Sequence, residues 1–113
     1  MWIASKHGFF SIVMKGSDEF HVRARFRSDL EELMETAGIE ETLHENTGTD
    51  YRYRLVVDRP VVTKIGAALF EEIDYGNFKN KIAETPSQQG KLSAYGDIWA
   101  IMFMLQNSGY EED

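Results

Sequence analysis

The segment FHVRARFR at residues 20–27 limits the possible folds most, because apolar and basic side chains alternate along it without exception. Successive side chains of a β-strand point to opposite faces, so the alternation predicts a strand with one buried and one solvated face. The apolar parity holds Phe20, Val22, Ala24 and Phe26, and the basic parity holds His21, Arg23, Arg25 and Arg27. A second segment, YRYRLVVD at residues 51–58, places Tyr51, Tyr53, Leu55 and Val57 on one side and Arg52, Arg54 and Val56 on the other.

Turn residues and helical periodicities around these two strands complete the expected order of elements. Strands are predicted at residues 2–6, 9–15, 20–27, 39–45 and 51–58, the first three as a meander. Helices are predicted between Ser28 and Gly38, from Pro60 to about residue 74, after Asn77, and over about residues 91–107. This ββ-β-α-ββ-α-α order predicts an α+β fold, with an antiparallel or mixed sheet of about five strands and helices mainly on one face.

The first helix carries the clearest end signals in the chain. Ser28 is predicted to cap it, and Glu31 three residues later completes a capping box. Its core-facing stripe consists of Leu30, Leu33, Met34 and Ala37.

Length and composition set the class of protein. The 113 residues predict one domain, residues 1–113, and the absence of cysteine excludes disulfides, thiolate nucleophiles and cysteine-ligated zinc. A chain without cysteine suits the reducing cytoplasm, where we expect this protein. The longest apolar run, IWAIMFML at residues 98–105, falls well short of the roughly 18–20 residues that span a bilayer, and the start shows no signal-peptide pattern, so no membrane partner is expected.

The arginines of the two alternating strands are the main candidates for function. Five of the twelve lysine and arginine residues belong to this set, although the chain has a net charge of −7. They are Arg23, Arg25, Arg27, Arg52 and Arg54. Because guanidinium groups bind phosphate and carboxylate through paired hydrogen bonds, a sheet face lined with them predicts an anion-binding surface for a nucleic acid or nucleotide.

Two other interpretations of the arginines remain open at the level of sequence. Cross-strand ion pairs with Glu40, Glu41 or Glu45 would neutralise them, or the basic face could dock an acidic protein surface. Nearby aromatic side chains, Trp2 and either Phe9 or Phe10, could stack on bases, but the register of the first hairpin is not fixed by the sequence.

Other patterns give weaker indications of chemistry. The histidines His7, His21 and His44 lack metal-ligand spacing, and no glycine-rich phosphate loop occurs, so no metal and no cofactor are expected. A possible polar site for a small hydrolase or transferase consists of Asp74, Tyr75, Asn77 and Lys79. The alternative is a structural joint, in which Asn77 caps a helix and Tyr75 fills a corner.

The final predicted helix is apolar nearly all round, with an expected core stripe of Leu92, Tyr95, Trp99, Met102, Phe103 and Gln106. A helix of this kind is either central to a fold or covered by a partner. Residues 98–105 therefore predict a possible homodimer, or a protein-interaction module or inhibitor that also uses acidic helices.

Segments spread over the chain, MWIASKHGFFSIV, RAR, DYRYRLVVD, IDYGNFK and YGDIW, resemble a family of small bacterial proteins without an assigned activity. The resemblance implies a free-standing single domain and no activity, cofactor or catalytic residue. The function expected from the residues is therefore a non-enzymatic cytoplasmic binding or regulatory domain that engages an anionic partner.

Overall fold

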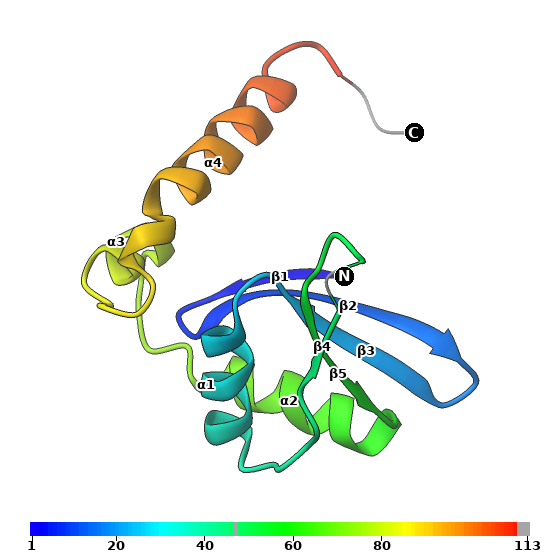
Figure 1. Ribbon diagram of the computed structural model, residues 1–113. Helices are drawn as coiled ribbons and strands as arrows, with labels where there is room; N and C mark the ends of the chain where they lie inside the picture. The colour runs from blue at the N-terminus through cyan, green and yellow to red at the C-terminus, as the bar shows by residue number, and fades with distance from the viewer. Residues whose placement is uncertain (47, 111–113) are drawn as a thin grey trace. The chain divides into compact units, whose positions relative to one another are not determined.

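The order of elements along the chain is that of an α+β fold, as predicted, in a computed structural model that describes residues 1–46 and 48–110 (Figure 1). The chain forms two compact units, Met1–Asp74 and Tyr75–Asp113. The first unit contains β1 (Trp2–Ser5), β2 (Gly8–Gly16), β3 (Glu19–Ala24), α1 (Arg27–Ala37), β4 (His44–Glu45), β5 (Tyr53–Val57) and α2 (Arg59–Glu71). The second contains α3 (Phe78–Ala83), a 3₁₀ turn (Gln89–Lys91) and α4 (Leu92–Gln106).

The strands of the first unit form a five-stranded sheet in the order β1-β2-β3-β5-β4. Each neighbouring pair is antiparallel, which decides between the antiparallel and mixed sheets that the sequence allowed. The predicted meander of the first three strands is confirmed. After α1 the chain enters the sheet at its edge, through β4, and returns through β5 to pair with β3.

Helices α1 and α2 lie on the same face of the sheet, and the core of the first unit lies between them and the strands (Figure 1). The strands contribute Phe10, Phe20, Val22, Ala24, Leu55 and Val57, and the helices contribute Leu30, Leu33, Ala37, Ile65 and Leu69. The apolar parities of β3 and β5 therefore face the helices, as the alternation predicts. Gly38 ends α1 with a left-handed φ of 66°, which also confirms its predicted role.

Three predictions at the junction of β3 and α1 are wrong. The strand ends at Ala24 rather than at residue 27, and Phe26 is exposed instead of buried. Phe26 occupies the N-cap position of α1 without a side-chain hydrogen bond, so Ser28 is inside the helix and does not cap it. The physical reason is that Phe26 keeps extended backbone angles while its carbonyl already accepts the N–H of Asp29, at 3.2 Å.

The other expected elements differ at their ends. Only His44–Glu45 of the segment 39–45 pairs with the sheet, and the helix that begins near Pro60 ends at Glu71 rather than at 74. Strand β5 begins at Tyr53, so Arg52 precedes the sheet ladder. Alternation of residue type extends beyond each strand, whereas a strand ends where its cross-strand hydrogen bonds end.

The second unit has a small core. The Asn77 side chain accepts the N–H of Asn80 at 2.9 Å and caps α3, as predicted, while Ile82 and Tyr95 are buried. The expected core stripe of the last helix is wrong at Trp99, Met102 and Phe103, which are exposed, whereas Tyr95 is buried. Among the described residues, no helix is both long and apolar enough to cross a bilayer.

Candidate anion-binding face

The sheet face opposite α1 and α2 carries one row of side chains that runs across all five strands. The strand register aligns, in order, Trp2 of β1, Ser11 of β2, Arg23 of β3, Arg54 of β5 and His44 of β4. Aligned residues on antiparallel neighbours point to the same side of the sheet. The parity argument from sequence therefore placed Arg23 and Arg54 correctly on a common face.

Arg23 and Arg54 are direct cross-strand neighbours, a position where two like charges destabilise a sheet. Among the described residues, no carboxylate lies at ion-pair distance from Arg23, Arg25 or Arg54. The expected neutralisation by nearby acids is thus wrong for these three arginines; the candidate acids were Glu40, Glu41 and Glu45. The open face holds concentrated positive charge without an internal counter-charge in the described part of the chain.

A tyrosine ring lies beneath two of these arginines. The guanidinium carbons of Arg25 and Arg23 are 4.2 and 4.8 Å from the centroid of Tyr51, which is only 4% exposed. Such cation–π contacts hold a guanidinium plane against a ring and leave its N–H edge available. Tyr51 was predicted to face the helices with Tyr53, but it precedes β5, where the alternation of the strand no longer applies.

Hydrogen bonds to neutral groups fix the orientation of Arg23 and Arg25. Arg23 donates from Nη2 to Ser11 Oγ at 2.7 Å and from Nε to the Ser11 carbonyl at 3.5 Å. Arg25 donates from Nη1 to the Asp50 carbonyl at 2.8 Å. A guanidinium has five N–H donors, so these contacts leave three on Arg23 and four on Arg25 without an acceptor among the described residues.

Arg54 is held by a similar set of neutral acceptors. It donates from Nη1 to His21 Nδ1 at 3.0 Å and from Nη2 to Thr49 Oγ1 at 3.2 Å. Because an arginine always donates, Nδ1 of His21 must accept, and Nε2 then donates to Glu19 Oε2 at 2.8 Å. The buried Nε of Arg54 has no hydrogen-bond partner among the described residues.

The remaining two predicted arginines lie outside this group. Arg27 belongs to the first turn of α1 and forms an exposed ion pair with Glu31, at 3.8 Å. Arg52 is exposed and precedes β5. Of the five arginines predicted from sequence, the structure therefore brings together Arg23, Arg25 and Arg54.

Two aromatic side chains lie at the β1 end of the same face. Phe9 is two residues from Ser11 on β2 and therefore shares its side of the sheet, whereas Phe10 is buried in the core. The rings of Phe9 and Trp2 are 6.2 Å apart between centroids, and Trp2 is 76% exposed. The register thus answers the question that the sequence left open: Phe9 is on the arginine side.

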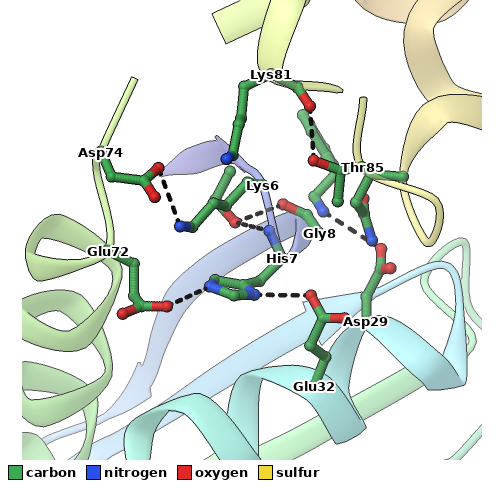
Figure 2. A network of polar contacts seen from close by, with 12 residues as sticks. Lys6, His7, Gly8, Asp29, Glu32, Glu72, Asp74, Lys81 and Thr85 are labelled. Atoms are coloured by element: carbon green, nitrogen blue, oxygen red, sulfur yellow. Dashed lines mark hydrogen bonds and ion pairs between the residues drawn. The ribbon is translucent and has the colours of Figure 1, made fainter. Parts of the chain in front are cut away.

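A second polar cluster, which sequence reasoning missed, lies at the β1–β2 turn (Figure 2). His7 contacts Glu32 Oε2 through Nδ1 at 2.7 Å and Glu72 Oε1 through Nε2 at 2.9 Å, and Lys6 pairs with Asp74 at 3.1 Å. These contacts tie the turn to α1 and to the end of α2. No group of three or more metal-ligating side chains with metal-site geometry occurs among the described residues.

The side chains of the possible polar site each have a contact that stabilises their own unit. Asp74 pairs with Lys6 in the first unit. In the second unit Asn77 caps α3, Tyr75 packs 6.1 Å from Phe78 between ring centroids, and the Lys79 ammonium lies 4.6 Å from the Trp99 ring centroid. These contacts match the structural alternative for this segment, and a catalytic role stays a prediction.

Comparisons with known proteins give no assignment for this face. No protein-family model matches the chain, and neither a curated protein nor a solved structure matches it. The functional argument therefore depends on the contacts described above.

Proposed function

We propose that the open sheet face binds single-stranded nucleic acid, with Arg23, Arg25 and Arg54 contacting its phosphates. The observation that carries this proposal is that three guanidinium groups lack an ion-pair partner among the described residues, with Arg23 opposite Arg54 and with Arg25 over the same tyrosine ring as Arg23. The protein would act as a non-enzymatic binding or regulatory domain. Its lack of cysteine suits the cytoplasm, where we propose that this binding occurs.

Electrostatics supports an anionic ligand on this face. Placing Arg23 directly opposite Arg54 costs folding free energy, because like charges on neighbouring strands repel each other. A bound phosphate would reverse the sign of that contribution by accepting hydrogen bonds from both guanidinium groups. Arginine is better suited to this than lysine, since its planar fork donates two parallel hydrogen bonds.

The aromatic rings beside the arginines favour single-stranded nucleic acid over an isolated phosphate. Trp2 and Phe9 lie on the same sheet face as Arg23 and Arg54, the arginine row. Base stacking on such rings contributes about 1–3 kcal/mol per base. Bases in a duplex are already stacked on each other and cannot reach a flat sheet in this way. Proteins that bind single strands without sequence preference combine aromatic rings, which stack on bases, with positively charged side chains, which contact the backbone.

The acidic side chains of the first unit favour binding at this face only. Glu31, Glu35 and Glu71 are exposed on α1 and α2, which cover the opposite side of the sheet. With a net charge of −7, the protein repels polyanions elsewhere, so the ligand is steered toward the arginines.

The experiment measures the fluorescence anisotropy of labelled RNA and DNA single strands of about 16 nucleotides, a length that covers one small binding face. We expect the wild type to bind at low salt and to lose affinity as salt is added, because phosphate neutralisation releases counterions. The double variant Arg23→Glu/Arg25→Glu should not bind detectably. Unlabelled ATP at the same phosphate concentration should compete poorly, which separates a strand from a nucleotide.

The matched control is Arg59→Glu/Lys64→Glu, which makes the same change of charge on α2. It should retain wild-type affinity, since these side chains lie on the helical layer. Absence of binding by the wild type would reject the proposal. Equal losses of single-strand affinity in the two double variants would show that net charge, and not the arginine row, determines binding.

A further inference from the structure

Helix α4 exposes an apolar surface that the second unit does not cover. Residues 98–105 include seven large apolar side chains, whose exposure ranges from 40% at Leu105 to 61% at Met104. The large apolar residues buried in this unit are Ile82 and Tyr95. A continuous apolar surface of this size on a protein typically marks an interaction site.

The exposed side chains of α4 are arranged in a stripe suited to helix pairing. Ile98, Ile101, Met102 and Leu105 follow the i, i+3, i+4, i+7 spacing that aligns side chains along one side of a helix. Trp99 and Phe103 flank this stripe, with stacked rings 5.0 Å apart and an interplanar angle of 8°. The Lys79 ammonium also lies 4.6 Å from the Trp99 ring centroid, and a ring held in this way has less rotamer freedom to lose on binding.

We propose that this stripe pairs with the same stripe of a second copy of the chain, with the two α4 helices antiparallel. The segment 98–105 contains no charged residue, so two copies meet without burying a charge. Asp97 is the one charged residue of α4, in its N-terminal half. An antiparallel pair separates the two Asp97 carboxylates and opposes the helix dipoles, whereas a parallel pair brings like charges and like dipole ends together.

The available area predicts a dimer of modest affinity. With about 100 Å² from each half-exposed large side chain, the stripe and its flank bury roughly 600 Å² per copy. A standard stable interface buries about 800 Å² per partner, so the pair lies slightly below that size. We therefore expect dissociation constants in the micromolar range, within reach of a concentration series.

The experiment is sedimentation velocity of the full chain from about 1 to 200 µM, a range that brackets micromolar affinity. The mass should rise from that of a monomer toward that of a dimer. Ile101→Asp should keep the protein monomeric throughout, with unchanged helix content by circular dichroism. The matched control Phe70→Asp alters another exposed apolar residue, on α2, and should dimerise as the wild type does.

Because the chain has no cysteine, engineered thiols test the orientation directly. In an antiparallel pair Ile98 faces Leu105 of the other copy, so mixing Ile98→Cys and Leu105→Cys proteins should give mainly the mixed disulfide. Predominant disulfides between identical variants would overturn the antiparallel arrangement. A wild type that stays monomeric at all concentrations, or association that Ile101→Asp does not change, would overturn the proposal.

Discussion

The two faces of the sheet are built by alternate residues of the same strands, and they differ in how their side chains are stabilised. On the covered face Val22 and Leu55 are fully buried against α1 and α2. On the open face their chain neighbours Arg23 and Arg54 repel each other and bind only neutral acceptors among the described residues. The comparison indicates that the covered face supplies the stability of the first unit, while the like-charged pair on the open face lowers that stability.

The largest difference in unfolding free energy is expected between substitutions of two adjacent phenylalanines that lie on opposite faces of the sheet. Phe10→Ala removes a fully buried ring from the core and should lower the free energy of unfolding by about 3–5 kcal/mol. Phe9→Ala, on the open face, should cost less than half as much because its ring is only partly buried. Urea denaturation of both variants measures the difference. Equal losses would break the distinction between the faces.

A smaller loss of unfolding free energy is expected from a substitution at Gly8, the first residue of β2. Gly8 has a φ of 152°, and an added Cβ would lie 2.6 Å from Asp29 Cγ and 2.9 Å from Phe10 Cζ. Gly8→Ala should therefore cost about 1–3 kcal/mol, through backbone strain and the displaced core. Gly66→Ala is the control, because it lies in α2 with nothing within 4 Å, and it should be neutral or slightly stabilising. Thermal unfolding of the pair gives the comparison.

The contacts of His7 should contribute less to the free energy of unfolding than Phe10 or Gly8. His7→Ala removes two contacts to carboxylates, at 2.7 and 2.9 Å, and should cost about 1–2 kcal/mol, since both partners are partly solvated. His44→Ala, at the exposed edge of the sheet, should leave unfolding unchanged. A loss at His44 equal to that at His7 would contradict the structural role of the cluster.

Sequence patterns predicted most of the first unit because alternation and helical periodicity directly record which side chains are buried. They identified both strands of the arginine row and the stripe of α1, including Leu30 and Leu33. They failed at Phe26, which follows β3, and at Tyr51, which precedes β5, because residue type alternates beyond the ends of the strand ladder. Parity assigns a face only while cross-strand hydrogen bonds continue.

Other features had no signal in the sequence. His7 contacts residues 25 and 65 positions away, and no local spacing indicates such a cluster. The apolar character of α4 was evident, but periodicity cannot show whether the molecule's own core or a partner covers it. The pairing of β3 with β5, which sets Arg23 opposite Arg54, depends on the strand order, and the local pattern does not fix that order.

The smallest effect on stability is expected from the arginines themselves. Arg23→Gln/Arg54→Gln loses hydrogen bonds to Ser11, His21 and Thr49 but also removes the repulsion between the two strands. We expect the free energy of unfolding to change by no more than about 0.5 kcal/mol in the absence of ligand. A loss of several kcal/mol in urea denaturation would show that the arginines serve the fold.

The decisive measurement is the salt dependence of single-strand affinity for the wild type and for this double glutamine variant. If three arginines each neutralise a phosphate, the logarithm of the association constant should fall with the logarithm of salt concentration with a slope of about −2. The variant should bind more weakly, with a slope near −0.7. Identical slopes and affinities for the two proteins, or no binding by the wild type at the lowest salt, would contradict a nucleic-acid-binding role for the open face.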